Sequence, residues 1–463
     1  MATFFFCGIG GIGMSAIALY LKNVGHRVLG SDRSFDLGNP NAVLTNLQNA
    51  GITLVPQDGS AVTKDIDTFV VSTAVEETIP DIKRARELNL TIKKRAEVLA
   101  DILHAYKGIA VAGTSGKTTT TAMLSHILYE NDLDPTMING GISLNTYNSC
   151  AQSNMIFGNG EYCVIEADEH DGTIELYSPY ISIVSNVSLD HKPLEVLRPL
   201  FENFIRRTKH GVVINADCPE IQKLHIDHPT VLSFSLKNDK ADLYAANITP
   251  LLQGTGFDLN GRHFELPVYG DYNVQNALAA AAAALHAGVP LADSMQALQS
   301  FKGTKRRLQK LGTQYGMTVI DDYAHNPDKI RATLETLKKY PGHTWAVFQP
   351  HGFAPTRLIK DELIHVLKEI IDDKLTFIAS DIYYVGGTVA KDICSDDFIA
   401  PVAKAGKDAR YIANRADIID FLLPKLKPDD KIIVMGARDD SLSDFAWEIL
   451  KQIKEYHSEQ HGI

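Results

Sequence analysis

The 463-residue sequence is poor in cysteine: it has only five, an odd number, and no two of them stand at the C-x-x-C spacing typical of a metal site. This usage argues against a disulfide framework and indicates reduced thiols in the cytoplasm. Long apolar runs are also lacking, since the stretch from Ala277 to Leu285 is shorter than the ~18 residues that cross a bilayer. The N-terminus lacks the basic start of a secretory signal. We therefore expect a soluble, cytoplasmic protein without a membrane partner.

A block of basic residues is missing as well, and the net charge of -11 is mild for this length. The composition therefore gives no support for a nucleic-acid partner. What the chain does contain is the ordinary mixture of a globular α/β protein, with 45% hydrophobic and 22% charged residues. At ~150 residues per domain, the length predicts about three domains. We delimit them as residues 1–105, 106–308 and 309–463.

The most informative motif is GTSGKT at residues 113–118, which follows an apolar run and opens into a helical pattern. A polyphosphate needs this order of strand, glycine loop and helix, because glycines let backbone N–H groups approach phosphate oxygens and the helix N-terminus adds positive charge. The lysine then reaches the terminal phosphates, and the next hydroxyl faces Mg²⁺. The loop is two residues shorter than the common pattern, and a plain tight turn is the alternative. We predict that ATP binds here, on Gly113, Thr114, Ser115, Gly116, Lys117, Thr118 and Thr119.

A second glycine motif, GIGGIG at residues 8–13, stands between a short apolar run and an apolar helix. With an acid about 20 residues further on, it matches the pattern that seats a pyrophosphate on a helix N-terminus. This geometry recognises a diphosphate, so NAD and a UDP-sugar are equally compatible, and a purely structural glycine turn is the third interpretation. The candidate ligand residues are Gly8, Ile9, Gly10, Gly11, Ile12, Gly13, Met14, Ser15, Asp32 and Ser72.

Polar residues follow two strand-like runs of the central region. The run 162–165 ends in Glu166, and the run 181–186 leads to Asp190 and His191. Because ligands collect at the carboxyl ends of strands in open parallel sheets, we expect these side chains near the predicted phosphate loop, residues 113–118. Glu166 is well placed as a Mg²⁺ ligand, directly or through water. A solvated surface acid and a hydrogen-bonded structural histidine are the respective alternatives.

The last third of the chain repeats the strand and helix alternation, with strands expected at residues 318–321, 344–348, 376–379 and 431–435. Upstream, Asn273 precedes an alanine-rich helix expected from Ala277, and its simplest interpretation is a helix cap. The whole pattern predicts an α/β protein of three domains, each built on a mainly parallel sheet. These are a Rossmann-like N-terminal domain, a P-loop central ATPase domain and a Rossmann-like C-terminal domain.

Several motifs follow one another in a fixed order: GIGGIG at 8–13, GTSGKT at 113–118, EADE at 166–169, NVSLDH at 186–191, NVQNA at 273–277, RR at 306–307 and DDYAHNP at 321–327. Together they resemble the Mur ligase family over nearly the whole chain. Within it, the opening GIGGIGMS is most similar to the alanine-adding branch, with the murein peptide ligases as near relatives. The resemblance implies that the first domain holds a UDP-sugar, the second binds ATP, and the third closes over both with the incoming amine.

Carried over motif by motif, the resemblance assigns roles to individual residues. The catalytic set is Lys117, Glu166, His191 and Arg307. Thr118 and Glu166 would hold one Mg²⁺ and His191 a second metal. Asn273 would face adenine, Arg307 the ATP phosphates, and Asp322 with His325 the ribose. His351 and Arg357 are the candidates for the acceptor pocket.

The reaction implied by the resemblance joins the carboxylate of UDP-N-acetylmuramate to L-alanine, or a similar amino acid, in peptidoglycan precursor synthesis. A carboxylate is a poor electrophile, so the γ-phosphoryl group of ATP first converts it to an acyl phosphate, which the amine then attacks. Metals and cationic side chains stabilise the charge that develops on the phosphoryl oxygens. The expected cofactors are ATP and Mg²⁺, and the expected form is a monomer or weak homodimer.

Some positions depart from the family pattern. Ser115 replaces the histidine usual in the ATP loop of the alanine-adding branch, and Gly352 and Pro355 stand where that branch has arginines that hold substrate anions. The acceptor is therefore open, and a pre-formed peptide, as in cell-wall recycling, is the first alternative. A UDP-sugar sensor without catalysis is the second. A nicotinamide-dependent oxidoreductase would use the first glycine motif but would leave the ATP loop unexplained.

Overall fold

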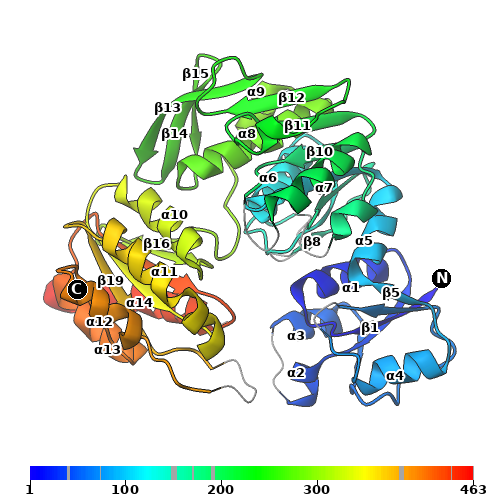
Figure 1. Cartoon of the computed structure of the whole chain (residues 1–463), viewed down its shortest axis with the longest axis horizontal. Coiled ribbons are helices and arrows are strands. Elements are labelled where there is room, and N and C mark those ends of the chain that lie inside the picture. Colours follow the sequence, from blue (N-terminus) through cyan, green and yellow to red (C-terminus); the bar gives the residue numbers. More distant parts are fainter. Residues whose placement is uncertain are drawn as a thin grey trace. The chain divides into compact units, whose positions relative to one another are not determined.

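The structure, a computed structural model, describes residues 1–38, 42–72, 75–147, 154–168, 172–188, 193–384, 390–439 and 441–461. Its three sheets are mainly parallel, with helices between many of the successive strands, which confirms the predicted α/β class (Figure 1). The chain forms two compact units. The first comprises Met1–Asn247, Phe257–Phe264 and Tyr272–Thr304, and the second comprises Ile248–Gly256, Glu265–Asp271 and Lys305–Ile463. Within the described ranges, no helix is long and apolar enough to cross a bilayer.

The first sheet has the strand order β3-β2-β1-β4-β5, and its pairings are parallel. Its strands are β1 (Thr3–Cys7), β2 (Arg27–Ser31), β3 (Thr53–Val55), β4 (Thr68–Val71) and β5 (Ile92–Lys94). Its helices are α1 (Ile12–Asn23), α2 (Arg33–Asp36), α3 (Ala42–Asn49), α4 (Pro80–Glu87) and α5 (Arg95–His104). Alternate residues of β1 face opposite sides, because Phe6 shares a buried cluster with Ile17 of α1, whereas Phe5 packs with Ile82 of α4. Apolar side chains therefore cover both faces of this sheet.

The second sheet has the order β15-β14-β13-β12-β11-β10-β6-β9-β7-β8. Its strands are β6 (Lys107–Ala112), β7 (Thr136–Ile138), β8 (Met155–Ile156), β9 (Tyr162–Glu166), β10 (Ile181–Val184), β11 (Gly211–Asn215), β12 (Val231–Ser235), β13 (Leu243–Leu251), β14 (Gly254–Leu259) and β15 (Arg262–Leu266). The helices along this stretch are α6 (Lys117–Glu130), η1 (Thr173–Leu176), α7 (Leu194–Arg206), η2 (Ile221–Lys223), α8 (Asp271–His286) and α9 (Leu291–Leu298).

The carboxyl ends of three neighbouring strands in the second sheet meet at one edge. Val111 of β6 pairs with Glu166 of β9, and Ala112 of β6 pairs with Val184 of β10, in parallel register. The segments that leave these strands must therefore start side by side. This register brings the phosphate loop, the acid after β9 and the segment after β10 together.

The third sheet has the order β16-β17-β21-β18-β19-β20, with β16 antiparallel to β17 and the other pairings parallel. Its strands are β16 (Gln309–Gln314), β17 (Met317–Asp322), β18 (Thr344–Gln349), β19 (Leu375–Ala379), β20 (Ala409–Tyr411) and β21 (Lys431–Gly436). Its helices are α10 (Pro327–Lys338), α11 (Phe353–Ile370), α12 (Asp396–Lys404), α13 (Arg415–Leu422), η3 (Leu423–Lys425) and α14 (Ser441–His461). The four strands expected in this region are present, while the domain boundaries at residues 105 and 308 stay predictions.

Candidate functional site

The loop at residues 113–116 joins β6 to α6. Gly113 and Gly116 adopt φ values of +135° and +87°, which residues with a side chain rarely adopt. Lys117 is the first residue of α6, and its Nζ donates a hydrogen bond of 2.6 Å to the carbonyl oxygen of Gly113. The ammonium group therefore folds back over the loop. Thr118 and Thr119 follow in the first turn and are buried.

Asn186, which follows β10, holds the phosphate loop. Its Oδ1 accepts a hydrogen bond of 2.8 Å from the Ser115 N–H, and its Nδ2 donates one of 2.9 Å to the Ser115 carbonyl. Its own carbonyl accepts from the Thr114 N–H at 3.1 Å. A Cβ at Gly113 would lie 3.0 Å from the Asn186 backbone nitrogen, so the close approach requires glycine. The neighbouring strand thus fixes the shape of the loop.

Gly116 lies against α8. A Cβ there would lie 2.5 Å from Asn276 Oδ1, which accepts a hydrogen bond of 3.1 Å from Thr120 Oγ1. Asn276 Nδ2 in turn donates to Asn273 Oδ1 at 3.1 Å. Asn273 is buried inside α8, which begins at Asp271, so the helix-cap interpretation is wrong: the helix starts before it. Through Asn276, Asn273 is connected to the phosphate loop.

Glu166 is the last residue of β9, beside the strand that carries the phosphate loop. Its Oε1 accepts a hydrogen bond of 2.9 Å from the Gly140 N–H, and a Cβ at Gly140 would lie 3.0 Å from both carboxylate oxygens. A Cβ at Gly141 would lie 2.6 Å from Thr118 Cγ2. Residues 140–141 therefore connect Glu166 to Thr118, the two side chains predicted to share a Mg²⁺ ion.

The N-terminal glycine loop, residues 8–13, is hydrogen-bonded to the end of β2. The N–H groups of residues 8 and 9 donate to the Ser31 carbonyl at 2.9 and 3.0 Å. Asp32 Oδ2 accepts from the Gly10 N–H at 2.8 Å, and its Oδ1 accepts from the Ser34 N–H at 3.0 Å. A Cβ at Gly10 would lie 2.7 Å from Asp32 Oδ2. Asp32 therefore holds the turn, and its role as a ligand residue stays a prediction.

A cavity of about 310 Å³ lies between the N-terminal glycine loop and the second sheet. Its lining consists of Gly11, Ile12, Gly13, Met14, Ser72, Arg95, Leu99, Ile138, Asn139, Gly140, Glu166 and Asp168. Asn154, which precedes β8, donates its Nδ2 to the Ile12 carbonyl at 2.6 Å, and Ser15 Oγ donates to the same oxygen at 2.9 Å. Part of the predicted UDP-sugar set and the predicted metal ligand Glu166 therefore line one cavity.

The oxygen donors around this cavity suit Mg²⁺. In the part of the chain that the structure describes, no group of three or more His, Cys, Asp or Glu residues is arranged to hold a metal. Mg²⁺, however, usually takes only one or two protein carboxylates together with substrate phosphates and water. Glu166 supplies a carboxylate, and Asn139 Oδ1 is buried without a hydrogen-bond partner among the described residues. His191, the predicted ligand of a second metal, lies outside the described residues.

Two adjacent arginines of the second unit differ in their surroundings. Arg306 is buried, and its guanidinium donates to the Gly436 carbonyl at 2.7 Å and to Asp321 Oδ1 at 3.3 Å. Arg307 is half-buried, and its guanidinium carbon lies 5.4 Å from the centre of the Tyr323 ring. Arg307 forms no hydrogen bond or ion pair with the described residues. Arg306 therefore joins two strands, and Arg307 is the one whose guanidinium is available to an anion.

Asp322 organises the segment around it. The carboxylate is buried and accepts hydrogen bonds from the N–H groups of Leu308 at 2.6 Å and Ala324 at 2.8 Å. Burial raises the pKa of this carboxyl. Both oxygens are engaged within the chain, so the predicted contact of Asp322 with ribose stays a prediction.

The two histidines predicted to face ligands lie close together. The ring centres of His325 and His351 are 5.5 Å apart, and His325 Nδ1 is 2.8 Å from the Tyr323 carbonyl. Burial lowers the pKa of His325 to about 4, so its imidazole is neutral at pH 7. Arg357, the other predicted acceptor residue, lies on α11 and forms an ion pair with Asp392.

Gly352 precedes α11 and has a φ of +68°. An arginine at this position, as in the alanine-adding branch, would therefore need a left-handed backbone or a changed helix start. The backbone conformation at this position therefore favours glycine over the arginine of that branch.

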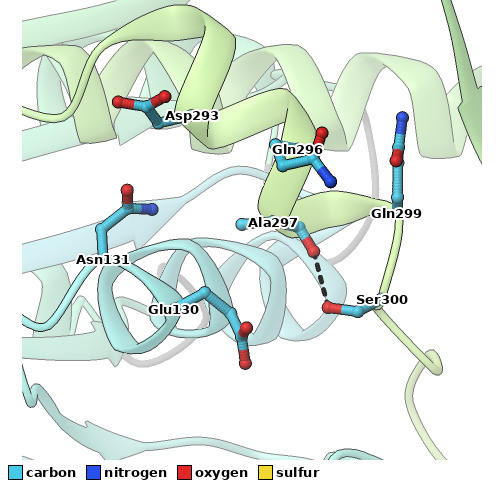
Figure 2. A pocket seen from close by; sticks show the side chains of 7 residues that line it. All are labelled: Glu130, Asn131, Asp293, Gln296, Ala297, Gln299 and Ser300. Atoms are coloured by element: carbon cyan, nitrogen blue, oxygen red, sulfur yellow. Dashed lines mark hydrogen bonds between the residues drawn. The ribbon is translucent and has the colours of Figure 1, made fainter.

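A second cavity, of about 420 Å³, lies between the C-terminal end of α6 and α9 (Figure 2). Its lining includes the carboxylates of Glu130 and Asp293 and the amide side chains of Asn131, Gln296 and Gln299. None of the described residues that line it is a cation, so the local charge disfavours a polyphosphate.

The sequence patterns did not single out Arg95, Asn139 or Asn186 as site residues. Each comes directly or within two residues after a strand: Arg95 after β5, Asn139 after β7 and Asn186 after β10. The rule that ligands gather at the carboxyl ends of parallel strands is the signal that would have found them.

Family models match most of the chain. The Mur ligase family catalytic domain matches residues 3–107, the Mur ligase middle domain residues 111–284, and the Mur ligase glutamate ligase domain residues 306–438. The chain is 34% identical over 465 residues to the UDP-N-acetylmuramate–L-alanine ligase of Pelotomaculum thermopropionicum, and the match covers 97% of each chain.

Two solved structures are similar along nearly their whole length. The UDP-N-acetylmuramate–alanine ligase MurC of Thermotoga maritima has a TM-score of 0.79 at 27% identity, covering 98% of this chain and 100% of that one. The murein peptide ligase of Psychrobacter arcticus has a TM-score of 0.67 at 23% identity, covering 98% and 99%, which is a likeness of fold. With three family models and a full-length relative in agreement, the chain belongs to the Mur ligase family of ATP-dependent ligases.

Proposed function

We propose that this ligase joins the carboxylate of UDP-N-acetylmuramate to the amino group of L-alanine in the synthesis of peptidoglycan precursors. Several full-length relatives at about 34% identity carry this substrate pair in their names. The observation that carries the proposal is the 310 Å³ cavity lined by both the N-terminal glycine loop and Glu166. A sugar carboxylate held from one side of such a cavity can meet a phosphoryl group held from the other.

The carboxylate must be activated before an amine can replace one of its oxygens. One carboxylate oxygen attacks the γ-phosphorus of ATP, ADP leaves, and an acyl phosphate forms; the amine then attacks the carbonyl carbon and inorganic phosphate leaves. We assign Lys117 to the β- and γ-phosphates, where its charge stabilises the departing ADP. The N–H groups of the loop that Asn186 holds are assigned to orienting the phosphates.

Thr118 and Glu166 are the residues that we assign to Mg²⁺. The hydrogen bond from Gly140 fixes Glu166 through Oε1 and leaves Oε2 for the cation. When bound, Mg²⁺ would neutralise part of the charge on the phosphoryl oxygens. His191 remains our candidate for the second metal.

The remaining assignments follow the family pattern. Asn273 is assigned to adenine, Arg307 to the ATP phosphates, and Asp322 with His325 to the ribose. Because burial lowers its pKa to about 4, His325 serves at neutral pH as a hydrogen-bonding group and not as a cation. His351 and Arg357 are assigned to the acceptor.

A specific observation supports one alternative acceptor. Gly352 and Pro355 replace two anion-binding arginines of the alanine-adding branch, and the backbone at Gly352 is left-handed. A ligase that attaches a pre-formed peptide to UDP-N-acetylmuramate has the same phosphate chemistry and a different acceptor pocket. The acceptor therefore decides between the two activities.

Phosphate release from ATP, measured with the purified protein across candidate substrates, tests the proposal. We expect steady release that requires both UDP-N-acetylmuramate and an amine, with the highest kcat/KM for L-alanine among L-alanine, glycine, L-serine and the tripeptide L-alanyl-γ-D-glutamyl-meso-diaminopimelate. A higher kcat/KM for the tripeptide would establish the recycling activity instead. Binding of UDP-N-acetylmuramate without phosphate release for any amine would instead support a UDP-sugar sensor without catalysis.

A further inference from the structure

Arg95 occupies the same edge of the first sheet as the N-terminal glycine loop. It follows β5 directly, while the glycine loop follows β1 and Ser72 follows β4. The strands β1, β4 and β5 are parallel neighbours, so their carboxyl ends point the same way. A Cβ at Gly13 would lie 3.3 Å from both Cδ and Nη1 of Arg95. The side chain of Arg95 therefore packs over the last glycine of the loop.

The charge of Arg95 has no ion-pair partner among the described residues. The side chain is half-buried, and it forms no hydrogen bond or ion pair with the described residues. Among the described residues that line the 310 Å³ cavity it is the one cation, beside the carboxylates of Glu166 and Asp168. A partly buried guanidinium has five N–H donors to satisfy, and the oxygens of a phosphate or a carboxylate match their geometry.

The neighbourhood of Arg95 contains further groups that a ligand would satisfy. Asn139 lines the same cavity and is 2% exposed. Its Nδ2 donates to the Thr118 carbonyl at 3.1 Å, which fixes the orientation of the amide, while its Oδ1 has no partner among the described residues. The first turn of α1 leaves backbone N–H groups near Gly13 without an intrahelical acceptor. Unsatisfied groups from three segments thus surround one space.

We infer that Arg95 binds the diphosphate of the nucleotide sugar, together with the N-terminal turn of α1. The inference rests on the proposed function, because that function supplies the nucleotide sugar. The diphosphate is favoured over the sugar carboxylate because the guanidinium lies against Gly13 in the first turn of α1, and a helix N-terminus with an arginine beside it binds phosphate oxygens well. Arg95 is therefore a binding residue that the glycine motif does not include.

Calorimetric titration of UDP, UDP-N-acetylglucosamine and UDP-N-acetylmuramate against the full chain tests this inference. Arg95→Gln should raise the Kd for all three ligands by about 10- to 100-fold, the usual effect of losing charge-assisted hydrogen bonds. Arg95→Lys keeps the charge without the paired donors and should recover part of the loss. The matched control is Arg27→Gln, which removes an exposed arginine, paired with Asp65, from the amino end of β2 in the same sheet and should leave each Kd unchanged.

The three ligands separate the outcomes. A loss confined to UDP-N-acetylmuramate would place the sugar carboxylate on Arg95 and overturn the diphosphate assignment. Equal affinities of wild type and Arg95→Gln for every ligand, with ligation intact, would overturn the inference and leave the proposed function standing. Failure of the wild-type chain to bind any uridine nucleotide would refute the proposed function itself. ADP affinity and Tm of Arg95→Gln should match the wild type, since a folding defect would lower both.

Discussion

The Lys117→Ala variant is expected to lose ligation by about 10³-fold, the effect of removing a main electrostatic contact to the reacting group. Lys117 begins α6, and its ammonium group folds back over the phosphate loop onto the Gly113 carbonyl. Alanine removes the charge while the loop keeps its hydrogen bonds to Asn186. Single-turnover phosphate release measures the chemical step, and titration with UDP should give the wild-type Kd because the glycine loop at residues 8–13 is separate from Lys117.

Lys107→Ala is the matched control for this variant. Lys107 lies at the amino end of β6, the strand whose carboxyl end carries the phosphate loop, and it forms an exposed ion pair with Glu161. This variant removes one positive charge at the amino end of β6 and leaves the phosphate loop at the other end of the strand unchanged. Near wild-type ligation by Lys117→Ala would mean that the γ-phosphate binds elsewhere, and equal losses in the two variants would point to a general effect of charge or folding.

The Glu166→Gln variant is expected to lower kcat by about 100-fold and to raise the Mg²⁺ concentration needed for half-maximal rate at least about tenfold. Glutamine keeps the size of the side chain and an oxygen for the Gly140 N–H, so the fold around residues 139–141 should survive. What it removes is the negative charge assigned to the cation. Phosphate release measured against total MgCl₂ at fixed ATP gives both quantities.

Glu161→Gln provides the control for Glu166. Glu161 comes just before the amino end of β9, whereas Glu166 ends the strand. The side chain of Glu161 is exposed and forms an ion pair with Lys107. This variant should have the wild-type Mg²⁺ dependence. An unchanged magnesium titration for Glu166→Gln would make Glu166 a structural acceptor for Gly140 only.

Local sequence patterns predicted the parts of the site that lie within one continuous segment. Residues 107–130 combine an apolar strand, two glycines, a lysine and a helix, and each feature is specified by its neighbours in the chain. The strands of the third sheet were predicted for the same reason, since their apolar runs and flanking helices are local signals. The family was predicted from the whole ordered set of short motifs, of which the two glycine loops are a part.

Features that arise from contacts between distant segments were not predicted. Arg95 follows β5, which has only the residues Ile92–Lys94 with two lysines and lacks the apolar signature of a buried strand. Asn139 follows the equally short β7, and its importance depends on its contact with Thr118 in α6. The helix containing Asn273 begins at Asp271, earlier than its alanine run, and Asn273 is buried and hydrogen-bonded to Asn276, the residue that lies against Gly116 of the phosphate loop.

The central claim is that the carboxylate is activated by phosphoryl transfer before the amine attacks. It is tested most directly with UDP-N-acetylmuramate carrying ¹⁸O in both carboxylate oxygens, by mass spectrometry of the inorganic phosphate formed during ligation. An acyl phosphate keeps one carboxylate oxygen bonded to phosphorus when the amine displaces it, so each phosphate released should carry one ¹⁸O. Phosphate free of ¹⁸O, formed at the same rate as the amide product, would contradict the account.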